Sequence, residues 1–335
     1  MFWLSYVLTI FINADKVYQE KCMYGGQEMA QSLQYFKALA DDTRLRLFCV
    51  LSRHELNVNE LIMILDMGQS RVSRHLKILA SSGLVKWRRD GLWVFYSAVQ
   101  EGEARQFADA VLPFVLRDAM FQADLSAAAS ILEERLSATR QFFNAIADDW
   151  DQLARDVLGS CDLSGVIAAA VPPGSVAVDL GCGTGEVLER MLSVASEVIG
   201  VDGSARMLDR ARHRFVGESV RVSLRIGDLE HLPLRDGEAD FISINMVLHH
   251  LFSPEAALEE ARRVLRPKGR LVLTDFDRHE NESMRVTYGD RWLGFTSESL
   301  RAALEKAGFA LVAAEKISVE KGLFVHFIQA EPAAS

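Results

Sequence analysis

Glycines and acids in the middle of the chain have a spacing that suits a ligand-binding loop. Three glycines follow the apolar run 176–180, which contains Asp179, and Asp202 ends the next apolar run. The glycines are Gly181, Gly183 and Gly185. Glycine lets a backbone approach a ligand closely, and a carboxylate at the Asp202 position suits the two hydroxyls of a ribose. The third glycine comes one residue too early for the G-x-G-x-x-G loop of dinucleotide sites, so the spacing favours a ligand without a pyrophosphate.

A strand, a helix and a second strand position this loop. Residues 176–180 are typical of a buried parallel strand, residues 187–192 repeat apolar side chains at helical spacing, and residues 198–201 form a second apolar run. Such a βαβ unit places its loop at the carboxyl end of the first strand, where open α/β sheets bind ligands. A third acid, Asp228, follows the next expected strand, 220–226.

The glycine loop, Asp202 and Asp228, followed by the stretch RVLRPKGRLVLTDF, resemble class I S-adenosylmethionine-dependent methyltransferases over about residues 140–335. The resemblance implies that the loop faces the methionine part of the cofactor, Asp202 the ribose and Asp228 the adenine edge. It also implies a Rossmann-like, doubly wound α/β sheet of seven strands with the last strand reversed. The cofactor-binding residues that it implies are Asp179, Gly181, Gly183, Gly185, Asp202, Asp228, Leu229 and Asn245.

No residue type identifies the methyl acceptor. The stretch ISINMVLHHL lacks the Asn/Asp-Pro-Pro-aromatic tetrad of base and amide methylases, and arsenite methylation would need more thiolates than those of Cys161 and Cys182. This part of the chain resembles the small-molecule methyltransferases that act on quinones and similar acceptors, and the resemblance implies an acceptor of that kind. The candidate general bases are His249, His250 and His279, although a loop of this kind also occurs as scaffold around the cofactor. The insertion 275–295 is either a substrate lid or a dimer or domain contact.

A helix expected over residues 69–80 has the chemistry of DNA recognition on one face. Val72, Leu76 and Leu79 face inward at helical spacing. Hydroxyls, an amide and cations occupy the other face, and such groups reach base edges and phosphates in a major groove. The expected DNA-contacting residues of this helix are Gln69, Ser70, Arg71, Ser73, Arg74 and Lys77.

A hairpin is expected after this helix. Two β-rich runs join through Asp90-Gly91, which predicts a turn with Arg88 and Arg89 near its tip. Together with two short helices expected within 31–51 and a third over 58–65, this stretch resembles the winged helix-turn-helix of the ArsR family of bacterial transcriptional regulators. The resemblance implies double-stranded operator DNA as a partner and a homodimer on a palindromic site.

One departure separates the chain from the metal-sensing members of that family. They carry paired cysteines in an E-L-C-V-C-E-L context, whereas this chain has ELNVNEL, with Asn57 and Asn59 at those positions. Neutral amides cannot replace thiolates for soft metal ions. We therefore expect no metal sensing by this helix, and we predict no metal ligands elsewhere in the chain.

Charge is distributed unevenly along the 335 residues. Residues 32–97 hold ten Lys/Arg against six Asp/Glu, a balance of +4, whereas the whole chain has a net charge of −9, so the remainder carries −13. A basic module in an acidic chain indicates one part that meets a polyanion. The four cysteines form no C-x-x-C pair, which favours a reducing compartment, and we expect a cytoplasmic protein without a membrane partner.

The roles of two further segments, the N-terminus and residues 138–156, are left open by the sequence. The N-terminus begins with a largely apolar stretch of 12 residues, too short to span a bilayer. This stretch either precedes a natural start at Met23 or Met29 or packs on a partner subunit. In the helical segment 138–156, Phe143 and Trp150 either cover the methionine end of the cofactor or belong to the core.

The expected organisation has four parts. The domains are 1–30, an apolar extension; 31–100, the winged helix-turn-helix; 101–139, a helical connector; and 140–335, the methyltransferase domain. An approximate heptad in the connector suits either dimerisation or packing against its own domain.

Two functions fit this organisation. In the first, an ArsR-like DNA-binding regulator uses its methyltransferase domain to sense S-adenosylmethionine or S-adenosylhomocysteine. In the second, the chain methylates a small molecule, and the winged helix serves autoregulation or dimerisation. The complete cofactor set supports ligand binding under either function, and the missing acceptor signature favours the sensor.

Overall fold

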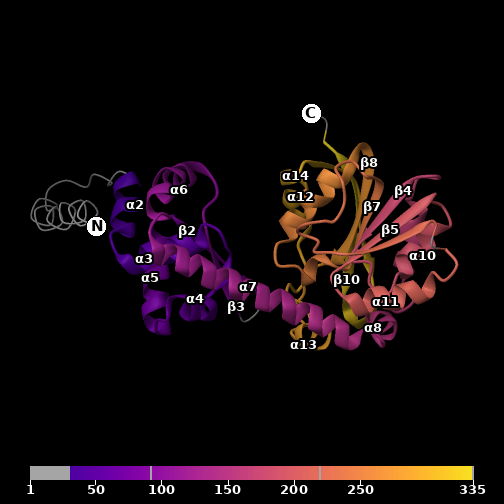
Figure 1. Ribbon diagram of the computed structural model, residues 1–335, viewed down its shortest axis with the longest axis horizontal. Helices are drawn as coiled ribbons and strands as arrows, with labels where there is room; N and C mark the ends of the chain where they lie inside the picture. The colour runs from indigo at the N-terminus through magenta and orange to yellow at the C-terminus, as the bar shows by residue number, and fades with distance from the viewer. Residues whose placement is uncertain (1–30, 91–92, 219, 334–335) are drawn as a thin grey trace, which may run out of the picture. The chain divides into compact units, whose positions relative to one another are not determined.

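The chain folds into two compact units. The computed structural model describes residues 31–90, 93–218 and 220–333, so the expected extension 1–30 lies outside them. The first unit ends at Arg135 and the second begins at Leu136 (Figure 1). Helix α7 (Ala119–Ile146) begins in the first unit and ends in the second. No helix within the described residues is long and apolar enough to cross a membrane.

The helices of the first unit follow the expected order. They are α2 (Gln31–Leu39), α3 (Asp42–Leu51), α4 (Val58–Leu65), α5 (Gln69–Ser81) and α6 (Gly102–Val115), followed by α7. Helix α4 begins with a capping box, in which Asn57 Oδ1 accepts the N–H of Glu60 at 3.1 Å and Glu60 Oε2 accepts the N–H of Asn57 at 2.8 Å. Asn57 therefore has a structural role in starting the helix that precedes the recognition helix.

A three-stranded antiparallel sheet completes the winged helix-turn-helix. Its order is β1-β3-β2, with β1 (Leu56–Asn57), β2 (Val85–Asp90) and β3 (Trp93–Ala98). The expected hairpin is present, since β2 and β3 pair as far as Asp90 and Trp93. The predicted turn residue Gly91 lies outside the described residues.

Residues of the expected connector 101–139 belong to the core of the first unit. Ala104 and Ala108 of α6 and Ala128 of α7 are buried in the same apolar cluster as the helices of the winged helix-turn-helix. Phe121 of α7 is 3% exposed. This part of the heptad stripe packs against its own unit, which is one of the two alternatives that the sequence left open.

An ion pair ties α7 to α3. Arg46 donates from Nε and Nη2 to the two oxygens of Asp124, both at 2.7 Å. The Asp124 side chain is 5% exposed and that of Arg46 is 18% exposed. A bidentate geometry compensates the loss of water around the two charges.

The second unit contains the expected seven-stranded doubly wound sheet. Its order is β6-β5-β4-β7-β8-β10-β9. The strands are β4 (Val176–Leu180), β5 (Glu197–Asp202), β6 (Val222–Ile226), β7 (Ala239–Asn245), β8 (Leu265–Phe276), β9 (Phe309–Ser318) and β10 (Phe324–Pro332). Strands β4 to β8 run parallel to one another, and β10 runs antiparallel to both of its neighbours, β8 and β9. The last strand is reversed, as predicted.

Helices cover both faces of this sheet (Figure 1). One apolar cluster joins the sheet to α9 (Leu163–Ala169), α10 (Glu186–Leu192) and α11 (Ala205–Arg214). The cluster on the other face includes α12 (Pro254–Val264) and α14 (Ser297–Lys306). Successive strand residues alternate between the two clusters, as Val198 and Ile199 of β5 do, because side chains of a strand point to opposite faces.

The Arg46–Asp124 pair provides a stability test. Replacing Arg46 with Met leaves a buried carboxylate without its partner, so we expect a loss of ~3–5 kcal/mol in the free energy of unfolding of the first unit. Urea denaturation, with amide exchange of α3 as a local readout, measures this loss. The control is Arg105→Met, since Arg105 pairs with Asp109 on the surface and should lose at most ~1 kcal/mol. Equal losses in the two variants would contradict the interpretation.

Candidate functional site

The glycine loop leaves the carboxyl end of β4 in a conformation that favours glycine. Gly181 has φ +75° and Gly185 has φ +87°. A Cβ on Gly181 would lie 2.5 Å from a methyl group of Val247, and one on Gly185 would lie 2.8 Å from the ring of Phe215. Gly185 is therefore needed where the start of α10 packs against the end of α11.

Asp202 holds this loop to the end of β5. Its Oδ2 accepts the N–H of Gly183 at 2.8 Å, and its Oδ1 accepts the N–H of Ser204 at 2.8 Å. A carboxylate oxygen has two lone pairs, so each oxygen keeps an acceptor site for a further donor. The same side chain thus shapes the loop and presents acceptors to the cavity beside it.

A cavity at the carboxyl ends of the parallel strands brings together the predicted cofactor residues, with the exception of Gly185. Those that line it are Asp179, Gly181, Gly183, Asp202, Asp228, Leu229 and Asn245. Asp228 Oδ1 accepts the N–H of Glu230 at 3.0 Å, and Asn245 Oδ1 accepts from the hydroxyl of Thr274 at 2.6 Å. These hydrogen bonds fix the directions of both side chains.

Helix α8 (Trp150–Leu158) closes one side of the cavity. Asp151 accepts from the hydroxyl of Thr184 at 2.5 Å and from Arg214 Nη2 at 2.9 Å. These contacts hold Trp150 near the glycine loop, and a Cβ on Gly183 would lie 3.6 Å from its indole nitrogen. Trp150 and Phe143 both line the cavity, where their rings pack edge to face at 5.5 Å.

The composition of the walls suits S-adenosylmethionine. The carboxylates of Asp179, Asp202 and Asp228 give the cavity negative charge, which complements a cationic ligand, and Asp202 offers acceptors for a diol. The aromatic rings of Phe143 and Trp150 supply apolar surface to the same cavity. The walls therefore match a cationic ligand that also carries a ribose and an apolar base.

Asp179 is the most strongly perturbed acid of the cavity. Burial raises its pKa to about 7, and nearby Asp202 acts in the same direction, while the hydrogen bond from Ser243 Oγ at 2.6 Å lowers the pKa. Burial also raises the pKa of Asp202. Two acids with raised pKa values side by side are typical of a ligand site.

Of the candidate general bases, only His250 lines the cavity. It belongs to the short helix η1 (Leu248–His250), and its ring lies 4.8 Å from that of Phe143. Burial, together with the neighbouring His249, lowers the pKa of His250 well below its ordinary value. His249 Nδ1 lies 2.8 Å from Asp275 Oδ1, and His279 packs edge to face on Phe276.

The insertion 275–295 contributes one residue to the cavity, Arg291. Its short helix α13 (Ser283–Thr287) buries Met284, and Tyr288 follows in the same apolar cluster. The Trp292 indole N–H donates to the carbonyl of Leu251 at 2.9 Å. Arg291 was not predicted, because nothing in the local sequence distinguishes it from other surface arginines.

Other cavity residues were also missed from the sequence. They are Leu136, Thr139 and Arg140 of α7, with Glu186, Ser204 and Phe252. Ser204 could have been found, since it follows Asp202 by two residues at a strand end. The α7 residues come from a helix far upstream of the motif, and only the fold brings them to the site.

The recognition helix α5 has the expected face. Val72, Leu76 and Leu79 are buried, together with His75. The predicted DNA-contacting residues of the helix, Gln69, Ser70, Arg71, Ser73, Arg74 and Lys77, are exposed. The helix thus presents an amide, hydroxyls and cations along one side.

The two arginines predicted near the tip of the hairpin, Arg88 and Arg89, differ in their exposure. Arg88 is half-buried on β2, donates to both oxygens of Glu55 at 3.0 and 2.6 Å, and lies over the ring of Phe95 at 4.6 Å. Arg89, the next residue, is exposed. The charge of Arg88 is therefore balanced within the first unit, a contact that the hairpin pattern did not indicate.

The raised pKa of Asp179 predicts a pH-dependent stability. A carboxyl whose pKa is higher in the folded than in the unfolded state makes the folded protein less stable as pH rises from about 4 to 7. We therefore expect Asp179→Asn to be more stable than the wild type without ligand, with an advantage that grows over this range and levels off at ~4 kcal/mol.

Urea denaturation at several pH values measures this advantage. Asp209→Asn, at an exposed position of α11, is the control and should show no such pH-dependent gain. An Asp179→Asn advantage that is constant with pH would show that the carboxyl does not titrate in this way.

Two family models match the chain. Residues 41–86 match the family described as bacterial regulatory protein, arsR family, and residues 178–273 match a family described as methyltransferase domain. The first match contains the recognition helix, and the second contains the glycine loop and the three acids of the cavity.

Curated relatives match parts of the chain. A protein described as an uncharacterised 37.1 kDa protein in a transposon of Streptomyces fradiae is 40% identical over 163 residues, 47% of this chain and 46% of that protein. A demethylmenaquinone methyltransferase from Lactiplantibacillus plantarum is 42% identical over 100 residues, 28% of this chain and 42% of the relative. An arsenite methyltransferase from Halobacterium salinarum is 29% identical over 155 residues, 43% and 39% of the two chains. The chain spans less than half the length of these three relatives.

A solved structure supports the fold of the second unit. The crystal structure of the (4+2)-cyclase SpnF is similar with a TM-score of 0.51 and 20% identity, over 58% of this chain and 95% of that one. At this identity the likeness shows the fold alone. On the two family matches and this fold, the chain consists of an ArsR-family helix-turn-helix domain, over residues 41–86, joined to a class I S-adenosylmethionine-dependent methyltransferase domain, over residues 178–273.

Proposed function

We propose that the chain is a DNA-binding transcriptional regulator whose methyltransferase domain senses S-adenosylmethionine or S-adenosylhomocysteine. The winged helix-turn-helix binds operator DNA, as a homodimer on a palindromic site. The ligand occupies the cavity of the second unit and changes the affinity for DNA. Such a regulator needs a structural element that takes part in both functions.

Helix α7 is the observation that carries this proposal. In the first unit its residues Phe121, Asp124 and Ala128 are buried. In the second unit Leu136, Thr139, Arg140 and Phe143 of the same helix line the cavity. Each set follows helical spacing, so the same helix contributes to a protein core in the first unit and to the ligand site in the second.

In this proposal, different residues of the cavity bind different parts of the ligand. Asp202 binds the ribose hydroxyls, Asp228 and Leu229 contact the adenine, and the glycine loop with Asp179 faces the methionine part. S-adenosylmethionine, when bound, supplies a sulfonium methyl group that can be transferred. The sensor function needs only that the two forms of the domain bind the ligand with different affinity.

A second function, methylation of a small molecule, is favoured by the relatives and by one side of the cavity. The demethylmenaquinone and arsenite methyltransferases are named for small acceptors. His250, Phe252 and Arg291 line the cavity in addition to the predicted cofactor set. They would form the acceptor side, with an imidazole, an aromatic ring and a cation facing the acceptor.

The recognition helix provides the DNA test. Arg74→Ala should weaken binding to a duplex that the wild type selects from a random pool by ~1–2 kcal/mol, about 5- to 30-fold. Wild-type affinity should fall steeply with salt, because phosphate contacts release counterions, and the variant should show a shallower salt dependence. Arg105→Ala, on α6, is the control. Equal binding by both variants, or binding that salt does not change, would refute the role of the helix.

The sensor function predicts a coupling between ligand and DNA. Saturating S-adenosylmethionine or S-adenosylhomocysteine should change operator affinity about 5- to 150-fold, a coupling of ~1–3 kcal/mol, as measured by fluorescence anisotropy. Operator DNA should change ligand affinity by the same factor. Asp202→Asn should remove the response and leave ligand-free DNA binding intact, whereas Asp209→Asn should retain both.

The second proposal, that the chain methylates a small molecule, predicts a different outcome of these measurements. If neither ligand changes operator affinity at saturation, while labelled methyl groups appear on a small acceptor from a cell extract, the sensor proposal is wrong and the enzyme proposal replaces it.

A further inference from the structure

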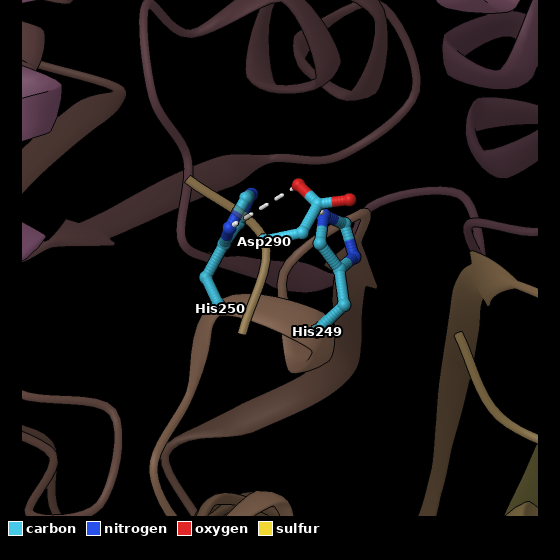
Figure 2. A group of neighbouring side chains, drawn as sticks. All are labelled: His249, His250 and Asp290. Atoms are coloured by element: carbon cyan, nitrogen blue, oxygen red, sulfur yellow. Dashed lines mark ion pairs between the residues drawn. The ribbon is translucent and has the colours of Figure 1, made fainter. Parts of the chain in front are cut away.

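Three buried side chains beside the cavity converge on one point (Figure 2). They are His249 and His250 of η1 and Asp290 of the insertion 275–295, and one ligand atom from each lies within 4.8 Å of the other two. Asp290 Oδ1 is 3.6 Å from His249 Nε2 and 3.9 Å from His250 Nδ1. The three side chains come from two segments that are distant in sequence.

The carboxylate of Asp290 has an environment that needs a cation. Its side chain is fully buried, and neither oxygen receives a hydrogen bond. Arg285 adds positive charge nearby, but its Nε donates to Glu282 at 3.0 Å. A buried carboxylate without donors is strongly unfavourable unless it takes up a proton or a cation binds it.

Asp275 orients His249 from the opposite side. Asp275 Oδ1 lies 2.8 Å from His249 Nδ1 and also accepts the N–H of Phe276 at 2.8 Å. With the proton of the ring on Nδ1, the lone pair of Nε2 points toward Asp290. A carboxylate that fixes the far nitrogen of an imidazole in this way is the usual second layer of a metal site.

A hydrogen bond between His249 and Asp290 explains the cluster less well. The 3.6 Å between His249 Nε2 and Asp290 Oδ1 exceeds the range of a hydrogen bond. Ligand atoms bound to one metal ion at ~2.0–2.2 Å lie ~3.0–3.5 Å apart. The two separations from Asp290 Oδ1 therefore need to close by only a few tenths of an ångström, while the two imidazole nitrogens, which lie within 4.8 Å of each other, need a larger shift.

We propose that His249 Nε2, His250 Nδ1 and the Asp290 carboxylate bind one divalent transition-metal ion. His250 Nδ1 also lies 3.3 Å from the carbonyl oxygen of Gly289, so binding the ion requires this long contact to be given up and the ring proton to move to Nε2. Two imidazoles and a carboxylate select zinc, iron, cobalt or nickel over calcium and magnesium, which prefer oxygen ligands. With both imidazoles neutral, the charges of Asp275 and Asp290 balance those of the ion. The ion ties the segment around Gly289 and Asp290 to η1, and so fixes His250 and Arg291 in the wall of the cavity.

The sequence predicts no metal site because no contiguous motif is present. His249 and His250 are adjacent, a spacing unlike the i, i+4 pairs on helices that mark zinc sites. Asp290 lies 40 positions after His250 in the sequence, in a segment with several other acids. Only the packing of the insertion against η1 brings the three ligands together.

Metal titration of the tag-free, full-length protein tests this site. After removal of metals with a chelator, Co²⁺ is added and its visible absorption is recorded, and Zn²⁺ is then used to displace it. We expect about one ion per chain. Asp290→Asn and His249→Gln should each weaken binding about 100-fold or more, and Asp275→Asn about 10- to 100-fold.

The control is His213→Gln, an exposed histidine of α11, which should bind Co²⁺ as the wild type does. Circular dichroism establishes that each variant is folded. Equal Co²⁺ affinity in the wild type and in Asp290→Asn would overturn the proposal, as would the absence of binding by the wild type.

X-ray absorption of the Zn²⁺-loaded wild type gives a second measurement that needs no variant. Nitrogen and oxygen ligands with imidazole scattering support the site. A sulfur ligand at ~2.3 Å would place the ion on a cysteine and overturn the proposal.

Discussion

The hydrogen bonds from the backbone of Gly183 and Ser204 to the carboxylate of Asp202 are the contacts on which the ligand cavity depends. They join the loop after β4 to the end of β5 across a parallel pair of strands. The loop can approach so closely because Gly181 and Gly185 have no side chain to meet Val247 and Phe215. The backbone N–H groups of Gly181 and Cys182 also donate to the carbonyl of Val201, and the Asp202 contact fixes the next residue, Gly183, in the wall of the cavity.

The cavity places acidic side chains close together in a buried environment, which is unfavourable for their ionised forms. Burial raises the pKa of both Asp179 and Asp202 and so opposes the ionisation of these carboxyl groups, which a cationic ligand would favour. A second buried pair of acids, Asp275 and Asp290, flanks His249 nearby. In both places the ligand that we propose accounts for a carboxylate at a position where an apolar residue would stabilise the folded protein more.

Residues that act within one contiguous motif could be predicted from the sequence, and residues brought together by packing could not. The glycine loop, Asp202 and Asp228 lie at strand ends whose order the βαβ pattern fixes, and the face of α5 follows from helical spacing alone. By contrast, Arg88 binds Glu55 and Asp290 meets η1 through contacts between separate segments. The heptad of α7 predicted a buried stripe but not its partner, because periodicity gives the face of a helix and not what covers it.

Helix α7 is likewise important for the coupling that we propose between ligand binding and DNA binding, and its role depends on packing as well as on periodicity. Its buried residues Phe121, Asp124 and Ala128 and its cavity residues Leu136, Thr139 and Phe143 continue one helical stripe by their spacing. A ligand that favours one position of Leu136 and Thr139 acts on a helix whose earlier turns are held by Asp124 and Arg46. In the sensor that we propose, such a helix would carry the coupling if it has two discrete arrangements that the ligand and the DNA both bias. A flexible linker of the same length would not do so, since its conformational freedom would absorb the shift.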